Sequence, residues 1–334
     1  MMNLTREPAM QRHSEVTRAL MLLAATGVVA MPALCEGQTF PVKPVRIVTA
    51  EPGGGNELAA RIVAQELTTT FGQQVIIDSR GGASGALAVQ AVSKAPLDGY
   101  TWLVFSNALW IIPLIKDVPW DLARDFAPVS ILAQAPNILV VHPSLPVRSV
   151  AELIKLARAR SGELNYASGA TGGGAHLAAE LFKATIKANM VRVRYKGTGP
   201  GLLALVSGEV QVMFPAAGSV VNYMKGNQLR ALAITSAQRS VLAPQLPTLA
   251  ESGMADYEAV SAYAMFAPAK TPLALITRMS DATGRALQSA EVKQRFLSAG
   301  VEPIGAPGER LESTIRADHA RWGKLIRAAG IRDD

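Results

Sequence analysis

The chain has 334 residues, 49% of them hydrophobic and 18% charged, with a formal net charge of +7 and one cysteine, Cys35. This composition argues against a disordered chain, and a lone cysteine excludes an internal disulfide or a thiolate metal cluster. The basic residues are scattered and not clustered among aromatic side chains, which argues against nucleic-acid binding. The length predicts two lobes.

The first forty residues predict an exported protein. Three arginines precede an apolar run over residues 19–34, and this order is typical of a secretory signal peptide. The run is shorter than the about 20 residues of a membrane span and is interrupted by glycine and proline. Small residues allow cleavage after Cys35 or Gly37, so residues 1–37 are expected to be a signal peptide and the mature protein to be soluble.

Apolar stretches alternate with helical patterns along most of the chain. We predict strands at residues 45–49, 74–78, 100–105, 137–142, 164–167, 191–195, 210–214 and 230–235. Helices are predicted at 58–70, from Gly85 to about Lys94, at 149–160, after Gly174, after Gly197, from Pro272, at 290–299 and at 311–329. This rhythm implies a largely parallel sheet that is covered by helices on both faces, with a second sheet in the middle of the chain. The alternation of Arg192, Arg194 and Lys196 with apolar residues predicts a half-buried strand whose basic face is solvated.

Four strand-to-helix junctions consist of glycine and small polar residues, at 52–56, 81–85, 168–174 and 197–201. Glycine lets backbone N–H groups face a ligand, and a helix start adds about half a positive charge at the same place. In open α/β sheets such junctions lie at the carboxyl ends of strands, where ligands bind. A single loop of this kind is more often only a tight turn. The first and third loops, one in each predicted lobe, are together expected to form an anion pocket.

The motifs of the competing functions are missing from the sequence. Neither dinucleotide-type glycine spacing nor a phosphate-binding loop occurs, and no serine has the G-x-S-x-G surroundings of a hydrolase. The histidines beyond the leader, His142, His176 and His319, have no metal-ligand spacing. We therefore predict no catalytic residue, no metal and no cofactor, with His176 placed to donate a hydrogen bond to a ligand carboxylate. An exported enzyme acting on a small organic acid remains the alternative.

Short motifs along the chain resemble one known family. They occur in the right order and include Pro44-Val-Arg-Ile-Val48, Pro52-Gly-Gly-Gly55, Asp98-Gly-Tyr-Thr101, Asp125-Phe-Ala-Pro-Val129, Leu164-Asn-Tyr-Ala-Ser-Gly169, His176-Leu-Ala-Ala-Glu-Leu-Phe182 and Gly208-Glu-Val-Gln-Val-Met-Phe214. Over essentially the whole chain after the leader, the sequence resembles the Bug family, the extracytoplasmic receptors of tripartite tricarboxylate transporters.

The resemblance implies the type II periplasmic-binding-protein fold, an α/β architecture in which two lobes are joined by two crossing strands and enclose a ligand cleft. Residues 38–140 and 262–334 would form one lobe and residues 141–261 the other, with crossings near 140–142 and 261–266. The implied protein is a periplasmic monomer. It captures a small organic carboxylate and delivers it to the membrane subunits of a tripartite tricarboxylate transporter. A sensor subunit that presents its ligand to a membrane kinase is a further alternative.

The resemblance also assigns a ligand site. Two glycine loops would grip a carboxylate through backbone groups, and three further segments would shape the distal end of the ligand. The expected ligand-binding residues are Glu51, Pro52, Gly53, Gly54, Gly55, Asn56, Ser106, Asn107, Ser168, Gly169, Ala170, Thr171, His176, Lys196, Gly197, Thr198, Pro215 and Ala216.

Three departures from the family pattern bear on the ligand. Pro215-Ala216 stands where an aspartate often follows, and Asn56-Glu57 replaces a common Thr-Asp pair. Glu57, at a helix start, is expected to be structural. Glu51 would repel a second carboxylate at about 4 Å by about 1–4 kcal/mol if it pointed inward. It therefore either faces solvent or accepts a hydrogen bond from the ligand, and we predict a ligand with one gripped carboxylate and a distal part that is not strongly anionic.

Overall fold

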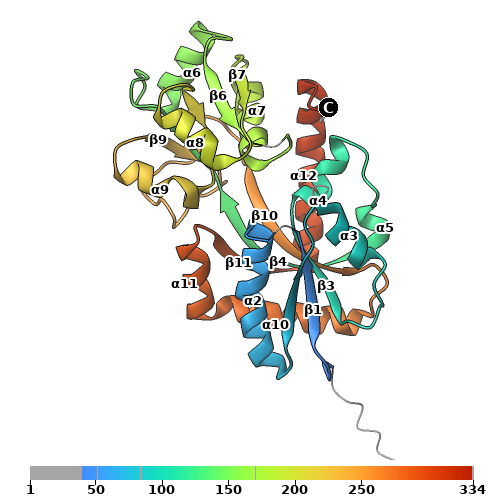
Figure 1. Ribbon diagram of the computed structural model, residues 1–334. Coiled ribbons are helices and arrows are strands. Elements are labelled where there is room, and N and C mark those ends of the chain that lie inside the picture. The colour runs from blue at the N-terminus through green and yellow to red at the C-terminus, as the bar shows by residue number, and fades with distance from the viewer. Residues whose placement is uncertain (1–39, 51, 83–84, 170, 333–334) are drawn as a thin grey trace, which may run out of the picture. The chain divides into compact units, whose positions relative to one another are not determined.

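The computed structural model describes residues 40–50, 52–82, 85–169 and 171–332. The compact unit described below is Pro41–Asp334 (Figure 1). The predicted signal peptide lies outside the described residues, as do Glu51 and Ala170 of the predicted site. Within the described part of the chain, no helix has the length and apolar character needed to cross a membrane.

The first sheet has six strands in the order β11-β4-β10-β3-β1-β2. These are β1 (Val45–Thr49), β2 (Val75–Ser79), β3 (Thr101–Ser106), β4 (Phe126–Pro136), β10 (Val260–Pro268) and β11 (Glu302–Pro307). β1 is parallel to β2 and β3, as the β–α rhythm predicts. β10 is antiparallel to β3 and β4, and β11 is antiparallel to β4. The expectation of a largely parallel sheet is therefore wrong for this half of the molecule, because β10, which lies between β3 and β4, and the edge strand β11 run opposite to the other four strands.

Helices cover both faces of this sheet. They are α2 (Gly55–Phe71), α3 (Ala86–Ser93), α4 (Ala108–Ile111), the 3-10 turn η2 (Ile112–Leu114), α5 (Leu122–Asp125), α10 (Leu273–Gln288), α11 (Ala290–Ser298) and α12 (Gly308–Ala329). α2 ends at Gly72, whose left-handed backbone (φ 63°) suits glycine. Trp110 packs edge-on against Phe266 with ring centroids 6.2 Å apart, deep in the core of this half.

The second sheet has five strands in the order β7-β6-β8-β5-β9. They are β5 (Ile138–Val141), β6 (Asn165–Ser168), β7 (Val191–Arg194), β8 (Val212–Met213) and β9 (Arg230–Ile234), covered by α6 (Val150–Ala159), α7 (Gly174–Ile186), α8 (Thr198–Val206) and α9 (Ala217–Lys225). β6 is parallel to β7 and β8, whereas β5 is antiparallel to both of its neighbours. The Ser149 hydroxyl caps α6 by accepting from Glu152 N at 3.2 Å, as the sequence predicts.

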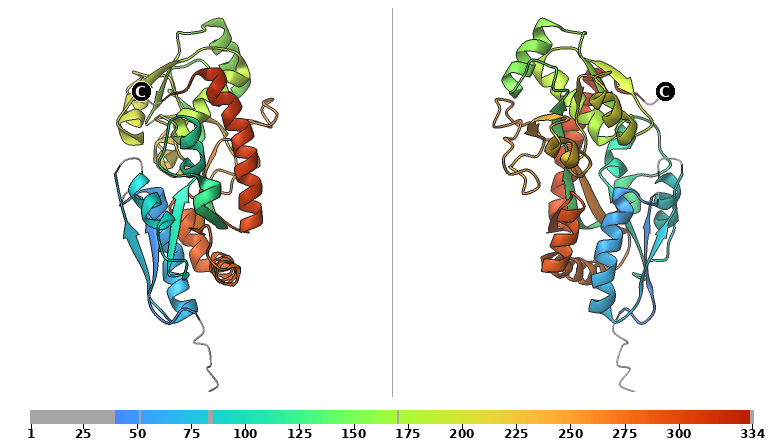
Figure 2. Two further views of the ribbon diagram at one scale, coloured as in Figure 1. Left: turned by 90° about the vertical axis from the view of Figure 1, so that its right-hand side faces the viewer. Right: turned by 60° about the vertical axis from the view of Figure 1, so that its left-hand side comes forward.

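Two segments carry the chain between the sheets. β4 leads through Asn137 directly into β5, and the return segment reaches β10 through Ala259. The buried Thr235 links them, because its hydroxyl donates to Ala259 O (2.7 Å) and accepts from Asn137 N (2.8 Å). The first crossing thus lies just before the expected 140–142. α12 also extends past both sheets, contacting β4 of the first half and α7 of the second (Figure 2).

Candidate functional site

A cavity of about 100 Å³ lies where the two halves meet beside the crossing strand β10. Of the described residues that line this cavity, none carries a charged side chain. An anion held here must therefore be bound by backbone N–H groups, hydroxyls and the asparagine amide. The lining consists of Ser106, Asn107, Ala108, Gly172, Gly173, Gly174, Leu177, Ala259, Val260, Ser261 and Trp322.

Asn107, predicted as a site residue, fixes one wall of the cavity. It follows β3, and its backbone N–H donates to Ala262 O at 2.8 Å. Its side-chain Nδ2 donates to Val260 O at 3.0 Å. Both hydrogen bonds are accepted by backbone carbonyl groups of the β10 chain beyond the last residue of β3, where the β3–β10 pairing has ended. Asn107 therefore holds the start of α4 against the crossing strand and shapes the cavity there.

The start of α7 forms the opposite wall. Gly173 is the N-cap and, among the described residues, receives no side-chain cap. The first helical bond runs from Leu177 N to Gly173 O at 2.9 Å, so the preceding first-turn N–H groups have no partner within the helix. They add the positive end of the helix dipole to an uncharged cavity. A Cβ at Gly174 would lie 2.9 Å from Ser261 Oγ, so glycine is what allows this helix to approach the crossing strand.

His176 supports the glycine loop at residues 168–174 from within. This loop is called the second glycine loop below, and the loop at residues 52–56 is called the first. It is 4% exposed, and its Nδ1 accepts a hydrogen bond from Gly172 N at 3.1 Å. Burial, followed by the positive charge of Arg192, lowers the pKa of His176 to about 4. The imidazole is therefore neutral, and its expected role as a donor to the ligand is open only to Nε2.

Arg192 binds the same loop from the outside. Its guanidinium donates to Ser168 Oγ (2.7 Å), Gly169 O (2.9 Å) and Thr171 Oγ1 (3.3 Å). The interpretation of this segment as a solvated basic face is wrong for Arg192, which is only partly exposed. The parallel pairing of β6 with β7 places the arginine beside the loop that follows β6. Both strands are predicted from the sequence, so their parallel pairing is the signal that could have indicated the contact of Arg192 with this loop.

The first glycine loop has the same construction at α2. Gly54 is the N-cap and has no side-chain cap within the described part of the chain. Gly53 N donates to Glu57 Oε2 at 2.5 Å, so this N–H group is already used. Glu57 also accepts from Arg61 Nε (2.9 Å) and Ser79 Oγ (3.0 Å). The Gly53 hydrogen bond, followed by that of Arg61, lowers the pKa of the carboxyl, and the structural role predicted for Glu57 is confirmed.

Ser261, which lines the cavity, and Tyr263, two residues further along β10, were not among the residues expected from the sequence. Tyr263 pairs with Ser106 in the β3–β10 ladder, so both side chains are on one face. A Cβ at Gly55 would lie 2.1 Å from the Tyr263 hydroxyl oxygen, so the tyrosine rests against the first glycine loop. Burial raises the pKa of Tyr263, which therefore remains a hydroxyl donor. The ring links this loop to the wall of the cavity.

The remaining predicted residues do not line the cavity. Gly197 is the N-cap of α8. It lies beside the second glycine loop, because a Cβ at Gly169 would be 3.6 Å from the Cα of Gly197. Pro215 O accepts from Ile138 N at 2.9 Å, and Ala216 pairs with Asn137, so this segment adjoins the crossing. Within the described residues no group of acidic, histidine or cysteine side chains could hold a metal. Outside the cavity lining lie Pro52, Gly53, Gly54, Gly55, Asn56, Ser168, Gly169, Thr171, His176, Lys196, Gly197, Thr198, Pro215 and Ala216.

Comparison with known proteins identifies the family. The model described as tripartite tricarboxylate transporter family receptor matches residues 59–331. The chain belongs to this receptor family. Protein BugT of Bordetella pertussis is 33% identical to this receptor over 324 residues, which covers 95% of the receptor and 99% of BugT. As a member of this receptor family, the protein is a solute-binding receptor and not an enzyme.

Solved structures of similar proteins show the same fold. A structure of an R. palustris protein with adipate is 34% identical, with a TM-score of 0.75, and the match covers 88% of this receptor and 99% of that chain. MatC from Rhodopseudomonas palustris with bound malate is 27% identical, with a TM-score of 0.70 and coverage of 86% and 100%. The periplasmic binding protein BugD shares the fold at 24% identity and a TM-score of 0.71. The fold is that of periplasmic binding proteins, as the resemblance implies.

Proposed function

We propose that this receptor binds one carboxylate of a small organic acid in the cavity between its two halves and delivers the acid to the membrane subunits of a tripartite tricarboxylate transporter. The observation that carries this proposal is the meeting of the uncapped start of α7 with an uncharged cavity. Backbone N–H groups at a helix start bind anions without any cationic side chain. The relatives with adipate and malate support the same ligand class.

The distal part of the ligand is proposed to be polar and not strongly anionic. A cavity of about 100 Å³ accommodates one end of a small acid. The hydroxyls of Ser106, Ser261 and Tyr263 lie on the adjoining face of β3 and β10. Hydroxyls suit a ligand hydroxyl, amide or keto group, whereas a second carboxylate is usually matched by a cation. The described cavity lining offers no such cation.

Calorimetry on the purified protein tests both parts of the proposal. We expect hexanoate and 6-hydroxyhexanoate to bind at least as tightly as adipate, and citrate to bind weakly. Tight binding of citrate would contradict the distal part alone. Failure of every carboxylate in a thermal-shift screen, with tight binding of an uncharged or cationic solute, would overturn the carboxylate grip itself.

We further propose that the two halves act as lobes that close on the ligand, as in hinge-bending receptors. The division at residues 38–140 with 262–334 and 141–261 is kept in outline, with Ile138–Val141 assigned to the second half, where β5 lies. Export through residues 1–37 and a monomeric state belong to the same proposal. Small-angle scattering of the protein with and without a confirmed ligand tests the closure, which predicts a smaller radius of gyration when the ligand is bound.

A further inference from the structure

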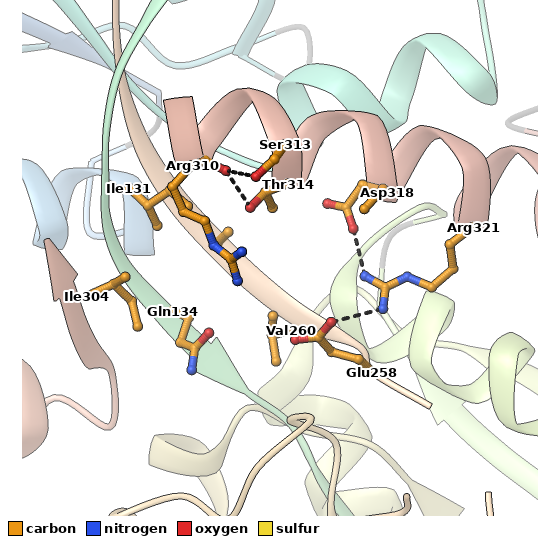
Figure 3. A pocket seen from close by; sticks show the side chains of 12 residues that line it. Ile131, Gln134, Glu258, Val260, Ile304, Arg310, Ser313, Thr314, Asp318 and Arg321 are labelled. Carbon is orange, nitrogen blue, oxygen red and sulfur yellow. Dashed lines mark hydrogen bonds and ion pairs between the residues drawn. The ribbon is translucent and has the colours of Figure 1, made fainter. Parts of the chain in front are cut away.

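A larger cavity lies on the face of β10 that points away from the candidate ligand cavity. Its volume is about 460 Å³, and β4, β10, β11 and α12 form its walls (Figure 3). Ala259 and Ser261 line the cavity of about 100 Å³, whereas Glu258 and Ala262 line the larger one and Val260 borders both. Because successive side chains along a strand point to opposite faces, β10 is a shared wall. The smaller cavity is called the first cavity below and the larger one the second cavity.

Small side chains on α12 keep the second cavity open. Ser313, Thr314 and Ala317 line it from the middle of this helix. The hydroxyls of Ser313 and Thr314 donate to Arg310 O at 2.8 and 2.9 Å, so they lie against their own helix and do not reach across the space. The strands on the other side supply an apolar floor, made of Ile131, Val260, Ala262 and Ile304.

One end of the second cavity is negatively charged. Asp318 and Glu258 share the guanidinium of Arg321, at 2.6 and 3.1 Å. The second oxygen of Asp318 accepts from Trp110 Nε1 at 2.9 Å. Glu258 uses only Oε2 in its hydrogen bond to Arg321, so it retains a free carboxylate oxygen at the edge of the cavity (Figure 3). Two carboxylates and one guanidinium give this end a net charge of −1.

The other end of the second cavity carries an unpaired cation. Arg310, in the first turn of α12, is exposed, and its guanidinium makes no hydrogen bond or ion pair with another described residue. Figure 3 shows this side chain extending from α12 into the cavity. Lys293 and Glu302 line the adjoining space and offset each other in charge, and Arg239 there is paired with Glu251 at 3.0 Å. This end therefore keeps the positive charge of Arg310.

The distance between the two charged ends indicates how long a matching ligand is. Arg310 and Asp318 are eight residues apart on α12, which is about 12 Å along the helix axis. The long side chain of Arg310 shortens this gap, but the residue forms no ion pair with Glu258 among the described residues. The charged groups of a ligand that reaches both ends are therefore separated by several methylene groups, which would lie on the apolar floor.

We propose that the second cavity is a separate binding site for a small zwitterion, an ω-amino acid whose carboxylate pairs with Arg310 and whose ammonium group pairs with Glu258. A simple carboxylate would leave the charge of Glu258 unmatched, and a simple amine would leave that of Arg310 unmatched. Only a zwitterion complements both ends. The inference does not depend on the proposed function, because the first cavity shares none of these charged residues.

Calorimetric titration with 6-aminohexanoate tests this site. The first cavity could also accept its carboxylate, so the titrations use Gly174→Ala protein, in which a methyl group 2.9 Å from Ser261 Oγ narrows the first cavity. If circular dichroism shows that this variant is not folded, wild-type protein saturated with adipate replaces it, because the second carboxylate of adipate is repelled by Glu258. Hexanoate and hexylamine, which each carry one of the two charged groups, are expected to bind about tenfold more weakly than 6-aminohexanoate.

Two variants made in the same background remove one charge each. Arg310→Gln and Glu258→Gln are each expected to weaken the binding of 6-aminohexanoate about tenfold. Arg316→Gln is the matched control, because Arg316 is an exposed arginine of the same helix that does not line the second cavity. Its affinity for 6-aminohexanoate should be unchanged. Circular dichroism checks that each variant is folded.

Each other result would overturn the proposal. Absence of 6-aminohexanoate binding up to about 10 mM would show that the second cavity is not a site for this class of ligand. Equal losses in Arg310→Gln and Arg316→Gln would show that general positive charge acts. Binding that Glu258→Gln leaves unchanged, or that hexanoate matches, would show that the ammonium group is not recognised. Failure of carboxylates to bind in the first cavity would refute the proposed function and leave this site standing.

Discussion

Arg192 offers the sharpest test of how the second glycine loop is held. Its guanidinium donates hydrogen bonds to Ser168, Gly169 and Thr171. Each bond from a charged donor contributes about 1.5–3 kcal/mol when fully buried, and Arg192 is only partly buried. Arg192→Gln is therefore expected to destabilise the folded loop by about 2–3 kcal/mol in total. About 1.4 kcal/mol of this cost is expected to appear in the free energy of ligand binding, which corresponds to tenfold weaker affinity.

The assay is calorimetric titration with the tightest carboxylate from a thermal-shift screen. Arg194→Gln is a matched control, because Arg194 lies two residues further along β7, is exposed, and makes no hydrogen bond or ion pair with the described residues. Arg192→Lys keeps the charge but not the planar fork, so it is expected to lose most of the affinity as well. Full affinity in Arg192→Lys, or an equal loss in Arg194→Gln, would show that general positive charge acts here and not the loop contacts.

Three further predictions concern the loops and their buried partners. Gly174→Ala places a methyl group 2.9 Å from Ser261 Oγ, so calorimetry should show at least tenfold weaker carboxylate binding with the fold intact by circular dichroism. Glu57→Gln is expected to cost about 1–3 kcal/mol of unfolding free energy near neutral pH. Because the pKa of Glu57 is lowered in the folded protein, the difference should shrink in urea titrations as the pH falls through that pKa. The pKa of His176 is lowered to about 4 from 6.5, so the unfolded chain takes up a proton first. The contribution of the neutral His176 to the free energy of unfolding should be complete above pH 6.5 and decline toward pH 4. His176→Gln should remove this pH dependence in thermal unfolding. Ligand affinity should not change between about pH 6 and 8.

Most strands and helices were predictable because each has a local signal. Buried apolar runs gave β1, β3 and β5 within one residue, and Pro272 and Ser149 mark the starts of their helices. β4 and β11 were not assigned as strands. β11 contains two prolines and a glycine, Glu302-Pro-Ile-Gly-Ala-Pro307, and is an edge strand, where the lack of a backbone donor is tolerated. Its pairing with β4 depends on tertiary contacts that a local pattern does not contain.

The candidate site was predictable only in part. The second glycine loop and Ser106-Asn107 reach the cavity region because strand ends in a β–α unit bring them there. Ser261 and Trp322 come from the last third of the chain, so only the crossing of β10 and the course of α12 bring them to the cavity. Gly53 shows a different limit: its N–H faces an anion as predicted, but the anion is the protein's own Glu57. Sequence patterns indicate which backbone amides point at an anion. They do not indicate whether that anion is a ligand or a carboxylate of the protein itself.

Selectivity and closing are expected to be coupled in this receptor because β10 serves both. The proposed carboxylate grip consists of backbone amides, which many sequences can supply, so we expect it to distinguish acids from other solutes and little else. The hydroxyls beside the cavity, Ser261 and Tyr263, belong to β10, and Glu258, which pairs with α12, lies two residues before this strand. A ligand that repositions these hydroxyls would therefore move the same strand about which we propose that the halves rotate. Substitutions on β10 that alter ligand preference should for this reason also shift the open–closed equilibrium.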